Sequence, residues 1–196
     1  MPKNPATTTR DALLAAAREE FAAHGIAGAR VDRIAARAGV NKERIYGYFG
    51  NKEKLFDAVI KDALDEFAAA NHVLADDPVA YVGAAFDHYR QHPELLRLLM
   101  WEALHERSEP LPDQYWRAER CGEKVTSLAA RLGEEPSPEV GRTVLSLLGL
   151  AMMPLAMSQL ADLLGAGTDS PESAAAMREH VVRFARAALE NRPSAT

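Results

Sequence analysis

Residues 28–55, which read GARVDRIAARAGVNKERIYGYFGNKEKL, constrain the fold more than any other part of the chain. Apolar residues recur over 31–38 at the spacing of one helical face. Gly39 then supplies a residue suited to the left-handed conformation that ends a helix, and Asn41 is a good N-cap for a second helix starting at Lys42. Two helices joined by a short turn containing Gly form a helix-turn-helix, whose second helix enters the major groove of DNA.

The charge of the chain is divided unevenly along the sequence. The formal net charge is −5, which on its own is unfavourable for binding to nucleic acid. Residues 1–52, however, carry a net charge of +4, whereas residues 53–196 carry −9. The positive field is therefore confined to the segment that holds the helix-turn-helix, and the acidic remainder would be repelled by DNA.

The same segment resembles the amino-terminal signature of the tetracycline-repressor (TetR) family. The matching residues agree in register over about the first sixty positions. They are Ile34-Ala35, Ala38-Gly39-Val40, Ile45-Tyr46, Tyr48-Phe49, Lys52-Glu53 and Leu55. The resemblance implies a helix-turn-helix DNA-binding domain at residues 1–50 and an effector-binding, dimerising domain at residues 51–196. It also implies a cytoplasmic homodimeric repressor that releases a palindromic operator when an effector changes the separation of its two recognition helices.

Sequence-specific contacts are expected from the first turn of the second helix. Arg44 can grip guanine O6 and N7 with two hydrogen bonds, and Glu43 can accept a hydrogen bond from cytosine N4. Lys42 can serve either a base or a phosphate. The alternative is that these charges form an ordinary solvated helix start.

The resemblance adds contacts to the phosphate backbone of DNA. In the family, the positions of Tyr46, Tyr48 and Lys52 contact phosphates. The family often has Thr or Ser where this chain has Ala29 and Arg30, so the usual hydroxyl cap and phosphate contact are missing there. We expect Arg30 to contact a phosphate through its charge instead.

The whole chain is predicted to be helical. It is rich in Ala and Leu, no alternating strand pattern occurs, and about nine helices can be distinguished. The first is expected at 9–24, the fourth at 51–71, the eighth at 139–164 and the ninth at 171–191. We expect the last two to pair across a twofold axis as a four-helix bundle. Their apolar faces hold Val144, Leu147, Leu148, Ala151, Val181, Phe184, Ala185 and Ala188.

A small-molecule pocket is expected among the fifth, sixth, seventh and eighth helices. The sixth helix, at 93–106, is apolar on more than one face, and large soft side chains accompany it. Such side chains with a few polar tips describe an adaptable pocket for a mainly apolar effector, although each residue alone also suits an ordinary core. Pro154 should bend the eighth helix. The candidate lining residues are Phe86, Tyr89, Met100, Trp101, His105, Trp116 and Met153.

Other features carry weaker signals. Cys121 is the sole cysteine, which fits a reducing compartment and leaves a thiol sensor or an inert thiol as alternatives. His88 and His92 lie four residues apart without an obvious third ligand, so surface histidines are favoured over a metal site. Residues 143–161 carry no charge over a length near that of a membrane span. We expect a buried interface helix there, not a membrane span.

Two rival functions and one open question follow from these observations. No nucleophile elbow, zinc spacing or glycine-rich phosphate loop occurs, so an enzyme has no positive support and no cofactor is expected. A helical ligand-binding or protein-interaction module that does not bind specific DNA is the main rival, and the charge division argues against it. The sequence leaves open whether the regulator represses or activates transcription.

Overall fold

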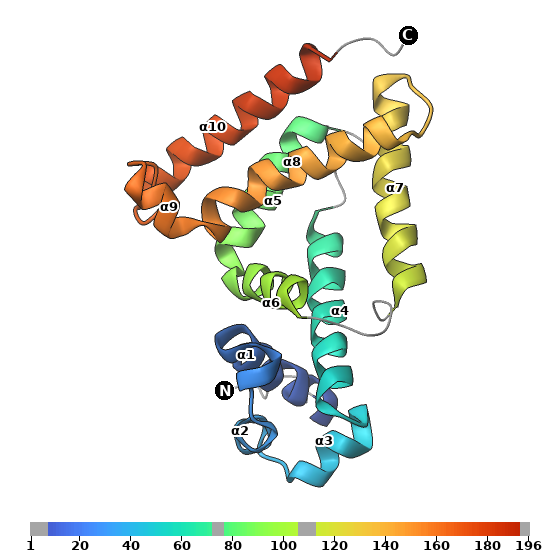
Figure 1. The fold of residues 1–196 in the computed structure, drawn as a ribbon, viewed down its shortest axis with the longest axis vertical. Helices are drawn as coiled ribbons and strands as arrows, with labels where there is room; N and C mark the ends of the chain where they lie inside the picture. Colours follow the sequence, from blue (N-terminus) through green and yellow to red (C-terminus); the bar gives the residue numbers. More distant parts are fainter. Residues whose placement is uncertain (1–7, 72–76, 106–112, 193–196) are drawn as a thin grey trace, which may run out of the picture. The chain divides into compact units, whose positions relative to one another are not determined.

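The computed structural model describes residues 8–71, 77–105 and 113–192. Over these ranges the chain forms ten helices and no strand (Figure 1), which confirms the predicted all-helical fold. Two compact units are distinguished: residues 8–67 with 94–105, and residues 68–71 and 77–93 with 113–192. The helices are α1 (Thr9–Gly28), α2 (Val31–Ala38), α3 (Lys42–Phe49), α4 (Lys52–Ala70), α5 (Pro78–Gln91), α6 (Pro93–Leu104), α7 (Gln114–Leu132), α8 (Pro138–Ala156), α9 (Ser158–Leu163) and α10 (Pro171–Glu190).

The described residues contain one helix more than the nine we expected because the predicted eighth helix is two helices. The chain leaves helical geometry at Met157, with φ −112° and ψ 45°, between α8 and α9. Pro154 lies one turn earlier and has no N–H to donate to the carbonyl of Leu150, which weakens the end of α8. The expected bend is therefore a break, three residues after the proline.

The first unit packs α1 to α3 with α4 and α6. The rings of Phe21 in α1 and Phe56 in α4 meet edge to face at a centroid distance of 5.1 Å, and both side chains are fully buried. Arg18 of α1 also forms ion pairs with Asp62 and Glu66 of α4, with N–O distances of 2.8 and 2.6 Å. Apolar packing and a two-carboxylate clamp thus hold α1 against α4.

A kink at Gly25 separates the last turn of α1 from the rest of that helix, which we expected to end at His24. Gly25 has φ 64° and ψ −178°, a backbone conformation that is essentially restricted to glycine. The ring of Trp101, from α6, lies so close that an added Cβ at Gly25 would be 2.8 Å from it. The Trp101 indole N–H also donates to the carbonyl oxygen of Ala22 at 3.3 Å. Trp101 is therefore a packing partner of α1.

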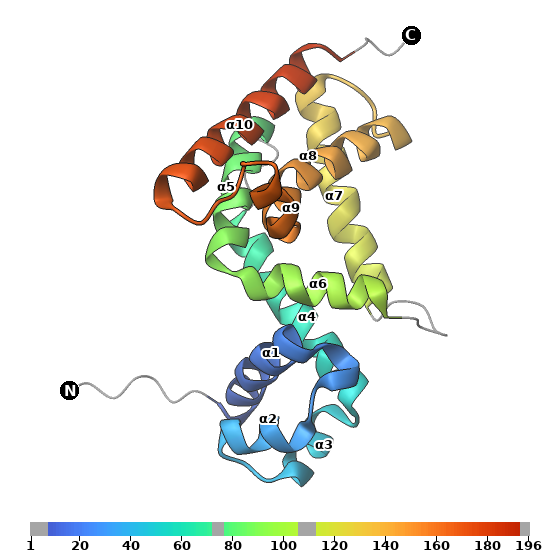
Figure 2. The ribbon, with the colours of Figure 1, turned by 60° about the vertical axis from the view of Figure 1, so that its left-hand side comes forward.

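The second unit is built around α5, which packs against α8 and α10 (Figure 2). Its Tyr81, Phe86 and Tyr89 side chains are buried. Arg178 of α10 lies over Gly83 of α5, where an added Cβ would meet the guanidinium at 2.8 Å, and it pairs with Asp87 at 2.7 Å. The absence of a side chain at Gly83 allows this close crossing of α5 and α10.

The apolar α8 overlaps the uncharged stretch at residues 143–161. By length and composition it is the one helix in the described ranges that is able to cross a membrane, and 22% of its apolar window is buried. The core or interface helix of a soluble protein meets the same test.

Candidate nucleic-acid interface

The predicted helix-turn-helix is present and is formed by α2 and α3. Gly39 ends α2 with φ 69° and ψ 30°, and the N–H of Val40 donates to the carbonyl of Ala35 at 3.0 Å, which completes a left-handed helix end. The side chain of Asn41 accepts a hydrogen bond from the backbone N–H of Arg44 at 3.2 Å and so caps α3. Local hydrogen bonding thus sets the angle of this turn.

The inner face of α3 is anchored by apolar packing. Ile45 is fully buried and Phe49 is nearly so, one helical turn apart. Ile34 of α2 is also fully buried. The remaining side chains of α3 are therefore displayed on the surface of the unit.

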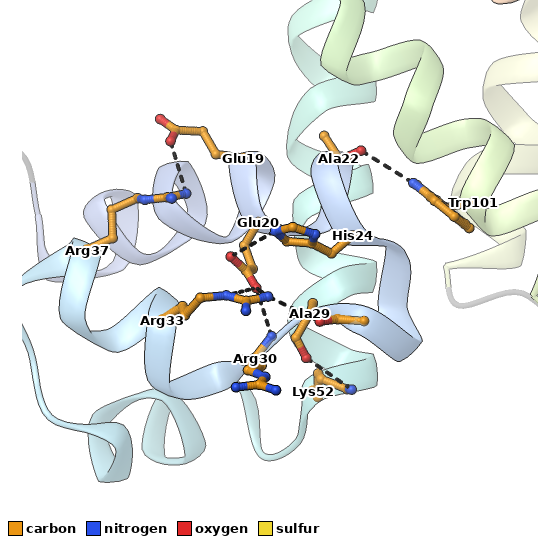
Figure 3. Close-up of polar contacts among 11 residues, drawn as sticks. Glu19, Glu20, Ala22, His24, Ala29, Arg30, Arg33, Arg37, Lys52 and Trp101 are labelled. Atoms are coloured by element: carbon orange, nitrogen blue, oxygen red, sulfur yellow. Dashed lines mark hydrogen bonds and ion pairs between the residues drawn. The ribbon is translucent and has the colours of Figure 1, made fainter.

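A buried glutamate replaces the missing hydroxyl cap at the start of α2 (Figure 3). Glu20 of α1 is 1% exposed, and its carboxylate accepts hydrogen bonds from the backbone N–H of Arg30 at 2.9 Å and from Nε of Arg33 at 2.8 Å. Arg33 also donates to the carbonyl of Gly28 at 3.2 Å. An anion at this position suits the N-terminus of a helix and offsets the absent Ser or Thr.

These contacts determine the ionisation of Glu20. Desolvation alone would raise its pKa, but the hydrogen bonds from Arg33 and from the Arg30 N–H, together with the charge of Arg33, outweigh it and lower the pKa. Glu20 was not identified from the sequence. Its signal was an acidic residue at helical spacing from the apolar Leu13 and Ala17.

The candidate base-reading residues lie at the exposed start of α3. Arg44 and Glu43 are exposed, and the side chain of Arg44 has no ion pair within the described residues. Lys42 is also exposed, but its Nζ lies 2.9 Å from Oδ1 of Asp32 in α2. The three residues share one turn, and one of them already has a partner.

The candidate phosphate contacts surround that turn. Tyr46 and Tyr48 are about half exposed on α3. Lys52 begins α4, and its Nζ donates to the carbonyl of Ala29 at 3.5 Å (Figure 3). The side chain of Arg30, just before α2, is exposed and has no ion pair in the described ranges. Six of the seven candidate DNA-binding residues are thus exposed on the first unit, and the seventh, Lys52, is half-buried.

The candidate effector residues are divided between the two units. Met100, Trp101 and His105 belong to the first unit, where Met100 and His105 are exposed. The others belong to the second unit: Phe86 and Tyr89 are buried in α5, Trp116 of α7 is half-buried with the guanidinium of Arg120 5.8 Å from its ring, and Met153 of α8 is exposed.

Met153 lines an apolar groove of about 490 Å³ between α8, α9 and α10. Met157, Leu160 and Met177 share this lining, and Ser146 and His180 contribute polar groups. The groove belongs to the second unit alone.

The other candidates from the sequence are the histidine pair His88 and His92 and the single cysteine Cys121. The rings of His88 in α5 and His92 just after it have centroids 4.5 Å apart and are tilted by 35°. Within the described residues no group of three or more His, Cys, Asp or Glu side chains is placed to hold a metal ion. Cys121 is exposed on α7.

Comparison with known proteins assigns both parts of the chain. Residues 13–59 match the family model described as bacterial regulatory proteins, tetR family, and residues 77–187 match the model described as tetracyclin repressor-like, C-terminal domain. The HTH-type transcriptional repressor SCO4008 of Streptomyces coelicolor is 36% identical over 186 residues, which cover 91% of this chain and 93% of that protein.

Solved structures agree with this assignment. The putative transcriptional regulator SCO4942 of Streptomyces coelicolor superposes with a TM-score of 0.73 at 34% identity, covering 92% of this chain and 97% of the other. AibR, solved in complex with isovaleryl coenzyme A and operator DNA, superposes with a TM-score of 0.66 at 18% identity, covering 90% and 97%, and shares the fold.

The Glu20 contacts predict a pH-dependent contribution to stability. Glu20→Gln should lower the free energy of unfolding at neutral pH by about 1–3 kcal/mol, because the Arg30 N–H and Nε of Arg33 then meet an uncharged, weaker acceptor. The wild-type pKa is lowered, so the carboxylate's contribution is complete above about pH 4.3, the ordinary pKa of Glu, and is lost as the pH falls through the folded-state value. Urea unfolding at neutral and acidic pH should show the difference between variant and wild type shrinking in acid.

Glu19→Gln provides the matched control. Glu19 is 70% exposed and pairs with Arg37 at 3.1 Å, so its substitution should change stability little. Equal effects of the two substitutions would contradict the assigned role of Glu20.

Proposed function

Because the chain belongs to the tetR family of bacterial regulatory proteins, we propose that it represses transcription as a homodimer that leaves its operator when a small molecule binds. The observation that carries the proposal is the exposed first turn of α3, where Arg44 lies on a helix anchored by Ile45 and capped by Asn41. The family is one of regulators, so we propose no catalytic activity. We place the protein in the cytoplasm, where it meets DNA.

We assign different roles to the residues of this surface. Arg44 reads guanine and Glu43 reads cytosine, because their side chains extend from the end of α3 that approaches base edges in helix-turn-helix proteins. Arg30, Tyr46, Tyr48 and Lys52 contact phosphates, which fixes the position of α3 without reading sequence.

These roles predict two different defects. Arg44→Ala should relax the preference at one base position in each half-site and weaken specific binding by about 1–3 kcal/mol, because a bidentate base contact is lost. Lys52→Ala should weaken binding to all duplexes alike and flatten the salt dependence by about one unit. Binding selection from random duplexes, followed by salt titration, measures both. An unchanged selected sequence with Arg44→Ala would refute the base-reading role.

We propose that the subunits pair through α8 and α10. Most of the residues that we expected to face the partner were assigned wrongly: Val144, Leu147, Ala151, Val181 and Ala185 are buried within their own unit, where α8 and α10 pack on α5. Phe184, which we also expected at the contact, is exposed, and Leu145 is an exposed apolar residue that we did not expect there. Leu145 of α8 is 71% exposed and Phe184 of α10 is 57% exposed.

An uncovered apolar surface of this kind favours association. Phe184 is exposed on α10, and the groove between α8, α9 and α10 is lined in part by Gly149, where an added Cβ would meet nothing within 4 Å. A twofold dimer has Phe184 and this groove on both subunits. Phe184 of each subunit can therefore enter the groove of its partner. We propose this pairing as the basis of a four-helix bundle.

The dimer proposal predicts a monomer from surface substitutions. Leu145→Glu with Phe184→Glu should leave the fold of the subunit intact, since both side chains are exposed, but should place charges in the contact and shift the protein to monomer at micromolar concentration. Tyr115→Glu on α7 is the control, because Tyr115 is 94% exposed and lies outside the proposed contact. Sedimentation equilibrium distinguishes these outcomes. A wild-type monomer, or a doubly substituted dimer, would contradict the proposal.

We propose that the effector is mainly apolar and carries one hydrogen-bonding group that meets Tyr81. Tyr81 of α5 is 1% exposed, and its hydroxyl has no hydrogen-bond partner among the described residues. Burial, and then the charge of Cys121, raises its pKa to about 12, so the hydroxyl is neutral at physiological pH and suits a carbonyl or hydroxyl group. Phe86, Tyr89, Trp116 and Met153 remain candidate contacts in the same unit as Tyr81.

This proposal predicts that substitution of Tyr81 raises the stability of the ligand-free protein and weakens its response to compounds. Tyr81→Phe should stabilise the ligand-free protein by up to about 1–3 kcal/mol, because it removes a buried hydroxyl without a partner. It should also reduce the melting shift caused by those compounds of a hydrophobic carbonyl and alcohol panel that stabilise the wild type. Tyr115→Phe, at an exposed tyrosine, is the matched control. A destabilised Tyr81→Phe protein, or one with an unchanged compound response, would refute the anchor.

A further inference from the structure

An ion pair connects the two helices of the helix-turn-helix. Lys42 is the first residue of α3, and its Nζ lies 2.9 Å from Oδ1 of Asp32 in the first turn of α2. The side chain of Asp32 is 75% exposed and that of Lys42 is 44% exposed. Both groups therefore lie on the surface that we assign to DNA, and neither is required to fill the core.

The cations of this surface differ in their partners. Arg33 and Arg37 of α2 pair with Glu20 and Glu19, which belong to α1. The side chains of Arg30 and Arg44 have no ion pair within the residues described. Lys42 therefore differs from its neighbour Arg44, because its charge is already satisfied before any DNA arrives.

This difference matters for the sequence-independent part of DNA binding. A free cation that neutralises a phosphate releases a condensed counterion, which is the main source of non-specific affinity. If Lys42 moves to a phosphate, one ion pair replaces another, and the carboxylate of Asp32 is left unpaired close to the negatively charged backbone. Lys42 then adds little to the attraction for random DNA.

Operator binding depends less on this cation. Hydrogen bonds from Arg44 to base edges add to the phosphate contacts there, whereas a random sequence offers phosphates alone. Keeping Lys42 paired with Asp32 therefore lowers the affinity for random DNA by a larger fraction than it lowers the affinity for the operator. Because competing non-specific sites are so numerous, the ratio of the two affinities determines occupancy of the operator.

We propose that Asp32 is a specificity-determining residue that holds Lys42 away from phosphates and so suppresses binding to non-operator DNA. The inference rests on the proposed DNA-binding function of α3. The hydrogen bond to Asp32, and then the charge of that carboxylate, raise the pKa of Lys42, so the ammonium group of Lys42 stays charged at neutral pH. Asp32 acts through Lys42, so its effect must disappear when Lys42 carries no charge.

The test is a double-mutant cycle on random-sequence duplexes of about 20 base pairs, with binding measured over a range of KCl concentrations. Asp32→Asn should steepen the salt dependence by about 0.9 units and tighten binding about five-fold at about 0.15 M salt, the effect of one further released counterion. In a Lys42→Gln background the same substitution should change the slope little. Asp32→Ser should repeat the result, and thermal melts verify that each variant is folded.

Glu53→Gln is the matched control for charge alone. Glu53 is exposed in the first turn of α4, and its substitution removes one negative charge from the same unit without releasing Lys42. A slope change in Glu53→Gln equal to that in Asp32→Asn would overturn the proposal, as would an equal gain from Asp32→Asn with Lys42→Gln. A wild-type protein that binds no duplex would instead overturn the DNA-binding function itself.

Discussion

The surface formed by α2 and α3 depends on one buried carboxylate. Glu20 lies in the apolar interior of the first unit, where an ionised group is unfavourable unless donors surround it. Arg33 and the backbone N–H of Arg30 supply those donors, and both belong to the segment that begins α2. The interaction therefore links α1 to the start of α2. The short turn at Gly39 in turn sets the position of α3 relative to α2. Removing Arg33 would leave the buried carboxylate of Glu20 without its charged partner.

A second contact ties α6 to the same framework. Trp101 packs against Gly25. Its indole N–H donates to the Ala22 carbonyl (Figure 3), so a residue far along the chain contacts the kinked end of α1. Glycine is required at position 25 both by its backbone conformation and by the nearness of the ring. The DNA-binding unit thus includes most of α6 besides the amino-terminal helices.

Local rules predicted the helix-turn-helix because each of its signals acts within a few residues. Gly39 ends one helix and Asn41 caps the next through hydrogen bonds to neighbouring backbone groups. Long-range partners were not predictable in this way: helical periodicity identifies Trp101 as apolar but does not say which helix it meets. The same limit explains why Val144 and Val181 were assigned to the subunit interface, since their apolar spacing fits a core and an interface equally well. Glu20 was detectable in principle, as a charge on an apolar stripe.

The central claim is that two copies of α3, related by a twofold axis, read DNA sequence. The most direct measurement is a binding selection in which the wild-type protein retains duplexes from a fully random pool. The account predicts enrichment of one inverted repeat, with half-sites spaced to place successive major grooves on one face of the duplex. Enrichment of no sequence, or of a single unrepeated site, would contradict it.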